Sequence, residues 1–240
     1  MNNTLILQII FVLTFLSKIG HTTADIIQLA AKIVDPSLDL PNFADYLIEL
    51  GFLNECEILP GVFVYALSRK GIYRFGGKKV DLEKVNYLYL EHATGIHYLI
   101  LEFIDVFNIV DFMYEPQLIS NEFRPDATLY NADETWFNLE YERTKKSPGN
   151  GSMARFFQKI IDRPTVVVFS RRSNLDLYLK YASQYLAKGI PYWAKVDGTW
   201  FMAGTIPFPQ EALLTIRFRM YGCLFSLTLE ELLRGETFPD

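Results

Sequence analysis

Three carboxylates near the middle of the chain have the residue types and spacing of a cation site. Asp126 follows Pro125, and Glu140 and Glu142 come later on either side of Tyr141. Oxygen-only ligands of this kind suit Mg²⁺ or Mn²⁺, and such an ion polarises a phosphodiester and lowers the pKa of a bound water. The residue types therefore indicate a site for metal-assisted hydrolysis of a phosphodiester.

Strand alternation brings these carboxylates towards one another. If residues 135–144 form a strand, Glu140 and Glu142 share a face, because successive side chains alternate. Residues 124–130 have the pattern of a preceding strand, and the short loop 131–134 makes the two strands antiparallel neighbours. Counting back from this turn places Asp126 opposite Glu140, within one or two residues. Carboxylates at this spacing repel each other, and a cation between them would relieve the repulsion.

The same stretch also fits a solvated surface hairpin that holds no metal. In that interpretation the acids pair with Arg143, Lys145 and Lys146, and all of these charges face water. Against it, the strand that carries Glu140 is rich in aromatic and aliphatic residues, which favours a position in a core sheet. Carboxylates inside a core sheet need a compensating partner.

Around these strands the apolar periodicity predicts an α/β domain with a mixed central sheet flanked by helices, in a chain that is α+β overall. Residues 165–170 are a β-branched run typical of a strand buried on both faces, and Asn174 is a suitable N-cap for the next helix. The predicted elements are a helix over 82–107, strands over 110–119, 124–130, 135–144 and 165–170, helices over 151–162 and 174–188, a hairpin over 192–196 and 200–203, a strand over 213–218 and a helix over 226–234.

The N-terminal part has the pattern of a winged helix, which is three helices followed by a two-stranded ribbon. The first helix covers the apolar run 5–16, and the second begins after Thr22 or Thr23. The third begins at Asn42 and ends at Gly51. Strands over 52–57 and 62–67 and a short helical turn over 68–75 follow.

Contact between this domain and DNA would not use the third helix in the usual way. That helix and the residues just before it carry Asp39, Asp45 and Glu49 and no lysine or arginine, which is poor chemistry for a phosphate backbone. Basic residues after the ribbon offer phosphate contacts instead: Arg69, Lys70 and Arg74. Docking of a protein is the alternative use of the domain. The basic linker at 76–79 (GGKK) predicts a boundary between a winged-helix domain at 1–79 and the α/β domain at 80–240.

Composition limits the class of protein. Half of the 240 residues are hydrophobic, which is ample for a packed core, and the net charge of −5 means that DNA contact must come from local basic clusters. Cys56 and Cys223 match no metal-ligand spacing and indicate a reduced, cytoplasmic setting. The run 5–16 lacks a preceding basic residue and is too short to span a bilayer, so we expect a buried helix rather than a signal peptide or membrane anchor.

The order of the predicted elements around Pro125-Asp126 and Glu140-Tyr141-Glu142 resembles the PD-(D/E)xK nuclease fold. More narrowly, the segment 124–127 (RPDA) and the segment 140–147 (EYERTKKS) resemble the plasmid replication-relaxation and MobC-type mobilisation proteins. Those proteins place a winged helix before a nuclease-like domain. The resemblance implies a metal-dependent DNA endonuclease or relaxase-like nickase that processes plasmid or mobile-element DNA, with Mg²⁺ or Mn²⁺ as cofactor.

The resemblance also implies roles for individual residues. Asp126 and Glu140 would be metal ligands, and Glu142 would be a third ligand or a base that orients water. Glu142 stands where the nuclease pattern has a lysine, so Lys145 or Lys146 would supply the missing positive charge. Further along, three basic side chains would contact DNA phosphates: Arg143 on the strand, and Arg155 and Lys159 four residues apart on the following helix.

A second class of function competes with the nuclease. A non-catalytic DNA-binding or adaptor protein could keep the nuclease fold, and both Glu142 in place of lysine and the acidic third helix favour that alternative. Glu102 and Glu115 are further acids that could complete the site. DNA is the expected partner in either case. Other mobilisation or replication proteins and a second copy of the chain are compatible with the resemblance, and no membrane is expected.

Overall fold

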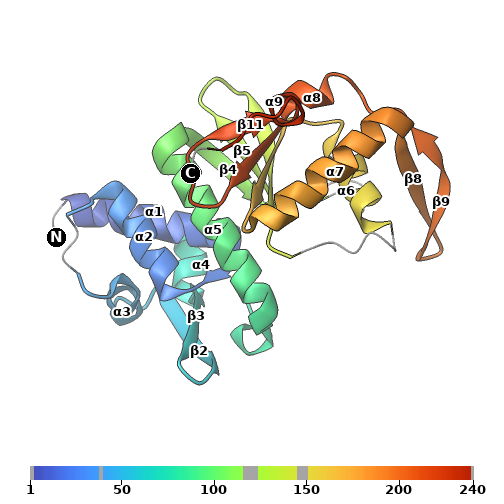
Figure 1. Ribbon diagram of the computed structural model, residues 1–240. Coiled ribbons are helices and arrows are strands. Elements are labelled where there is room, and N and C mark those ends of the chain that lie inside the picture. The colour runs from blue at the N-terminus through green and yellow to red at the C-terminus, as the bar shows by residue number, and fades with distance from the viewer. Residues whose placement is uncertain (1–2, 38–39, 116–123, 145–150, 239–240) are drawn as a thin grey trace. The chain divides into compact units, whose positions relative to one another are not determined.

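The computed structural model describes residues 3–37, 40–115, 124–144 and 151–238 (Figure 1). Within these ranges the chain is α+β overall, with a mixed sheet flanked by helices, so the predicted fold class is confirmed. The chain divides into two compact units, Met1–Tyr114 and Glu115–Asp240. The boundary predicted after Lys79 falls inside the first unit and stays a prediction. No helix among the described residues is long and apolar enough to cross a membrane.

The first unit contains the three helices and the ribbon expected of a winged helix. Its small antiparallel sheet has the order β1-β3-β2, so the ribbon gains a third short strand. The elements are α1 (Asn3–Ile19), β1 (His21–Thr22), α2 (Ala24–Val34), α3 (Phe43–Glu49), β2 (Leu53–Leu59), β3 (Val62–Leu67) and α4 (Arg69–Phe75), followed by η1 (Leu82–Lys84), α5 (Tyr87–Phe107) and β4 (Ile109–Tyr114).

Local sequence explains how these helices begin and end. The Asn42 side chain accepts hydrogen bonds from the backbone N–H groups of Ala44 and Asp45, which makes it the N-cap of α3. Gly51 follows the end of α3 with a φ of 76°, a conformation in which glycine avoids the strain of a side chain. The apolar run at the start of the chain forms α1, whose Val12 and Leu16 are fully buried, as expected of a buried first helix.

The second unit is built on a mixed sheet whose strands within this unit lie in the order β11-β10-β7-β6-β5. The strands β6, β7 and β10 are parallel neighbours, while β5 and β11 pair antiparallel at either side. The elements are β5 (Ala127–Asn131), β6 (Trp136–Glu142), α6 (Ser152–Ile160), β7 (Thr165–Phe169), α7 (Arg172–Lys188), β8 (Ile190–Val196), β9 (Thr199–Ile206), α8 (Ala212–Thr215), β10 (Ile216–Met220), β11 (Ser226–Thr228) and α9 (Leu229–Leu233).

One face of this sheet is covered by α6 and α7. Val167 and Phe169 of β7 belong to the same buried apolar cluster as Phe157 of α6 and Tyr178 of α7. Glu140 pairs with Val167 in the parallel register of β6 and β7, and Glu142 with Phe169. Because paired residues share a face, Glu140 and Glu142 point into the layer between the sheet and the two helices.

Two element boundaries differ from the sequence prediction. α7 begins at Arg172, and Asn174 lies inside the helix rather than at its N-cap. The Asn174 side chain instead donates to the backbone oxygen of Arg143 at 3.3 Å, which ties α7 to the end of β6. The strand predicted over 213–218 is also displaced, because residues 212–215 form the short helix α8 and the strand β10 follows it. The strand predicted to reach residue 119 is described only as far as Tyr114.

Candidate carboxylate site

Asp126 and Glu140 lie across from each other on neighbouring strands. The antiparallel register pairs Ala127 with Leu139, so the next position outward sets Asp126 opposite Glu140. Asp126 Oδ2 also accepts a hydrogen bond from the Tyr141 backbone N–H at 2.7 Å, which holds this carboxylate against β6. The register therefore agrees with the count made from the turn in the sequence.

Glu140 and Glu142 are buried to an unusual degree for carboxylates. Their exposed fractions are 3% and 6%, whereas ionised side chains are almost never fully buried without a partner. Glu142 Oε2 accepts a hydrogen bond from the hydroxyl of Tyr178 on α7 at 2.5 Å. Burial and the neighbouring Glu142 raise the pKa of Tyr178, so the phenol stays protonated and able to donate. The carboxylate at the position of the expected lysine is therefore fixed by a helix on the same side of the sheet.

Glu140 has a cationic partner on α6. Lys159 Nζ lies 2.5 Å from Glu140 Oε1, and the two side chains are only 19% and 4% exposed. We predicted from the sequence that Lys159 would contact DNA phosphate beside Arg155, but in this structure its ammonium points to the carboxylate. The helical spacing of Lys159 gave no signal for this pairing, because the pairing depends on how α6 lies on the sheet.

The acids of this site influence one another's protonation. Burial, and then the charge of Asp126, raise the pKa of Glu140 to about 8, although Lys159 opposes the shift. Burial and Asp126 likewise raise the pKa of Glu115, whose backbone N–H donates to the Asp126 carbonyl oxygen at 2.9 Å. Asp126 is thus the common neighbour of Glu115 and Glu140. A cation bound here would favour the ionised form of each of these carboxyl groups.

The donor set fits Mg²⁺ better than a metal that needs a complete protein cage. Among the described residues, no three histidine, cysteine, aspartate or glutamate side chains gather closely enough to hold an ion. Mg²⁺, however, usually keeps several waters and is bound through one or two carboxylates together with substrate phosphates. Asp126 and Glu140 provide such a pair, with oxygen ligands only. Glu142 is less suited to be a third ligand because the Tyr178 hydroxyl already occupies one of its oxygens.

The other basic residues of the predicted site go to different places. Arg155 lies over the rings of Trp200 and Trp193, at 4.8 and 5.8 Å from their centres, and so faces the β8–β9 hairpin. The backbone oxygen of Arg143 accepts from Ser170 and Asn174, which fixes the end of β6. Lys145 and Lys146 lie outside the described residues. Glu102 is part of α5 in the first unit.

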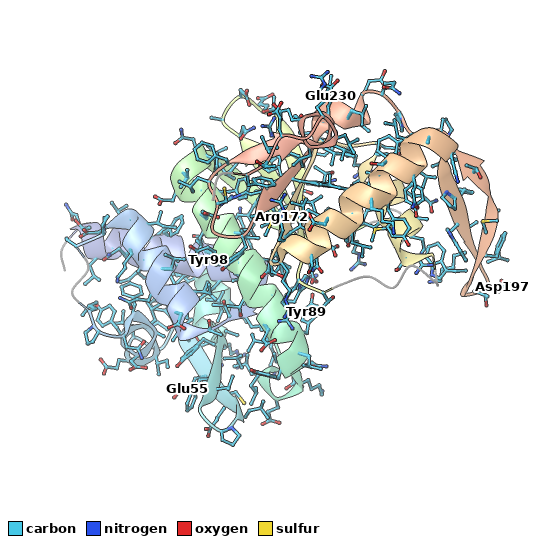
Figure 2. The ribbon with its side chains drawn as sticks, in the orientation of Figure 1. Glu55, Tyr89, Tyr98, Arg172, Asp197 and Glu230 are labelled. Atoms are coloured by element: carbon cyan, nitrogen blue, oxygen red, sulfur yellow. The ribbon has the colours of Figure 1, made fainter. Side chains whose placement is uncertain are left out.

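The β8–β9 hairpin is attached to α6 through one side chain. The Gln158 amide donates to the Trp193 carbonyl oxygen and accepts from the Trp193 N–H, at 3.4 and 3.1 Å. Gly151 precedes α6 with a φ of 72°, and a side chain there would overlap the Trp193 ring. Figure 2 shows Asp197 at the tip of this hairpin, at the end remote from α7. The residue that holds the hairpin, Gln158, is therefore the neighbour of Lys159 on α6.

The predicted DNA-contacting residues of the first unit lie on α4. Arg69 and Arg74 are exposed, whereas the ammonium of Lys70 is already engaged. It donates to the Leu50 carbonyl oxygen at 2.7 Å and lies 4.5 Å from the centre of the Phe52 ring. Lys70 therefore stabilises the end of α3, where a positive charge is favourable.

Comparison with protein-family models, with curated proteins and with solved structures finds no match.

Proposed function

We propose that this protein is a cytoplasmic, metal-dependent DNA endonuclease or relaxase-like nickase that processes plasmid or mobile-element DNA. The observation that supports the proposal best is the juxtaposition of Asp126 and Glu140 on adjacent strands with Lys159 beside Glu140. In metal-dependent phosphodiester hydrolysis, two carboxylates can hold a divalent ion and a lysine can balance the charge that develops on phosphorus. The two free cysteines support a reducing compartment.

In this proposal each side chain has a distinct role. Asp126 and Glu140 hold the ion, which when bound polarises the phosphodiester and lowers the pKa of a coordinated water. Lys159 balances the charge of Glu140, and it would stabilise negative charge on a phosphate group bound beside that carboxylate. Tyr178 holds Glu142 in place, so one oxygen of Glu142 is already used and Glu142 is not assigned to the ion. Lys159 thereby takes the part that we assigned to Lys145 or Lys146 from the sequence.

One plasmid-nicking experiment tests this function. The wild-type chain is incubated with supercoiled plasmid and Mg²⁺ or Mn²⁺, beside Asp126→Asn and Glu140→Gln, which keep side-chain size and remove the charge. Asp197→Asn is the matched control, since Asp197 is exposed at the tip of the hairpin. We expect metal-dependent nicking by the wild type and by Asp197→Asn, and a loss of at least about a hundredfold in the two site variants.

A second function is favoured by one observation about the same residues. Glu140 and Glu142 each have a partner within the protein, Lys159 and Tyr178, so their burial is partly compensated without any ion. A DNA-binding or adaptor protein that retains the nuclease fold, and assembles with mobilisation or replication proteins, would need no more than this. Absence of nicking with every divalent ion, together with DNA binding unchanged in Asp126→Asn and Glu140→Gln, would establish this second function and overturn the first.

A further inference from the structure

We propose that the exposed face of α4, together with Lys78 and Lys79, is a docking surface for single-stranded nucleic acid, with Tyr73 as its base-stacking residue. The inference deepens the proposed function, on which it rests for the presence of a nucleic-acid substrate. It specifies that the nucleic acid is single-stranded and names the surface that binds it. We call this surface the α4 surface: Arg69, Tyr73, Arg74, Lys78 and Lys79.

The charge of the segment points to an anionic partner. Residues 69–79 (RKGIYRFGGKK) contain five lysines and arginines and no acid, on a chain whose net charge is −5. A local excess of this kind attracts polyanions even when the whole protein is acidic. Arg69, Arg74, Lys78 and Lys79 are all exposed. These four cations are separated along the segment, so they suit the repeated phosphate groups of a nucleic-acid strand better than they suit one small anion.

The packing of α4 fixes which of its residues face outward. Gly71 is buried, and a side chain on it would lie 2.6 Å from the Phe52 carbonyl oxygen, so this side of α4 lies directly against the chain just before β2. Phe75 also faces this side, with its ring edge-on to Phe52 at 5.9 Å. Ser68 caps the helix by accepting from the Gly71 N–H at 3.1 Å. α4 is therefore held in one orientation, which presents Arg69, Tyr73 and Arg74 to solvent.

Tyr73 is the residue that distinguishes this surface from an ordinary basic patch. Its side chain is 94% exposed, and within the described part of the chain it has no hydrogen bond or ring contact. It lies one turn from Arg69 on the same face of α4, and Arg74 follows it directly in the chain. An aromatic ring among phosphate-binding side chains provides a platform for a base, and stacking contributes about 1–3 kcal/mol per base.

Stacking on Tyr73 selects unpaired bases. In a duplex each base face is already covered by its neighbours, so an exposed ring gains a stacking partner only from a base that has left the helix. The neighbouring helix α3 does not favour a duplex either, because Asp45 and Glu49 are exposed on it and repel phosphates. The α4 surface therefore fits a single strand better than a double helix.

The position of Lys78 and Lys79 is set by a glycine. Gly77 has a φ of 100°, and a side chain there would lie 2.9 Å from the Ser17 carbonyl oxygen of α1. The backbone at Gly77 is therefore held closely against α1, which places the two lysines that follow it. A side chain at Gly77 would push this segment away from α1 and disperse the cations.

Binding measurements without divalent ions test the surface separately from any cleavage. The probes are a fluorescein-labelled oligothymidylate and a labelled duplex of the same length, both in EDTA, read by fluorescence anisotropy. We expect the wild type to bind the single strand more tightly than the duplex. Tyr73→Ala should weaken single-strand binding by about tenfold and leave duplex binding within about twofold, whereas Tyr73→Phe should retain the affinity because the ring remains.

Charge variants and matched controls complete the test. Arg69→Glu with Arg74→Glu should weaken binding of both probes and flatten its salt dependence. Lys32→Glu is the charge control, since Lys32 is exposed on α2 in the same unit, and Tyr87→Ala is the ring control on α5. Neither control should change the affinity by more than about twofold. Thermal unfolding monitored by circular dichroism should be the same in the variants of Arg69, Tyr73 and Arg74 as in the wild type because these three residues are exposed.

Three results would overturn the inference. Tyr73→Ala could leave single-strand binding unchanged, it could weaken both probes equally, or the chain could bind phosphatidylglycerol vesicles through these residues and not the oligonucleotide. The nicking experiment fails or succeeds independently. If no nicking is observed but single-strand binding depends on Tyr73, the nuclease proposal fails and the α4 surface is supported. If Tyr73→Ala nicks plasmid and binds the single strand with unchanged affinity, the α4 surface is overturned and the nuclease proposal is supported.

Discussion

Lys159 Nζ on α6 lies 2.5 Å from Glu140 Oε1 on β6, in a layer where the carboxylate is 4% exposed. The pair joins a helix to the central sheet at the point where Asp126 approaches from the neighbouring strand. Removal of one partner from such a pair leaves the other as an isolated charge in a poorly solvated place, which is costly. The first two predictions follow from this relationship.

The first prediction concerns Lys159. In Lys159→Met, Glu140 loses the charge that opposes the rise of its pKa, so its pKa should rise above the present value of about 8. Stability should fall most at about pH 9, where the wild-type carboxyl is ionised, by about 3 kcal/mol. Nicking, if the proposed function holds, should need a higher pH than in the wild type. Urea unfolding and a pH profile of the nicking rate measure the two effects.

Lys159→Arg is the matched variant for that prediction. It keeps a positive charge beside Glu140 and should retain most of the stability and a pH profile close to that of the wild type. An unaltered pH profile in Lys159→Met, with stability reduced equally at all pH values, would show that Lys159 acts through packing and not through the charge of Glu140.

The second prediction concerns the pH dependence of folding. The pKa of Glu140 is raised from 4.5 to about 8, so the folded chain keeps a proton that the unfolded chain releases between these values. Its contribution to the unfolding free energy is therefore fully present below about pH 4.5 and is lost as the pH rises towards about 8. Urea midpoints measured at about pH 5 and about pH 9 should show a lower value at the higher pH.

Glu140→Gln tests the origin of that loss. Glutamine cannot release a proton, so the difference between the two urea midpoints should shrink in this variant. Glu230→Gln is a suitable comparison because Glu230, labelled in Figure 2, lies on α9 in the same unit and pairs with Arg234 at the end of that helix. An equal difference in the wild type and in Glu140→Gln would assign the pH dependence to other groups.

The third prediction concerns the hydroxyl of Tyr178. Tyr178→Phe removes the donor to Glu142 and preserves the ring, which packs edge-on against Phe156 and Phe169. A buried carboxylate that loses a hydrogen bond costs about 1–3 kcal/mol of stability. Tyr185→Phe, on the same helix, removes a hydroxyl that donates to no described side chain, and it should change stability by less than about 0.5 kcal/mol. Similar effects of the two substitutions on the urea midpoint would contradict the role given to the Tyr178–Glu142 bond.

The strand pattern predicted the carboxylate geometry because alternation and a short turn are local rules. Glu140 and Glu142 share a face, and Asp126 lies opposite Glu140, as the residue count indicated. The partners of these acids were not predictable in the same way. Lys159 and Tyr178 reach the sheet only because α6 and α7 cross that face, and helical periodicity does not say over which strand residue a helix will lie.

Two further differences have similar physical causes. Asn174 has the residue type of an N-cap, but its amide is used by the Arg143 carbonyl oxygen, so the long-range contact decides its role. Lys70 belongs to the predicted basic set, yet the Leu50 carbonyl oxygen and the Phe52 ring engage its ammonium. In both cases the sequence identified the correct chemical group, and only the packing of distant segments determined which partner it meets.

The two hydrogen bonds between Gln158 and Trp193 fasten the β8–β9 hairpin to α6. Gln158 is the residue before Lys159, so the same turn of α6 holds both the hairpin and the ammonium beside Glu140. Within the second unit, the β8–β9 hairpin and the carboxylate site are therefore anchored by neighbouring residues of one helix.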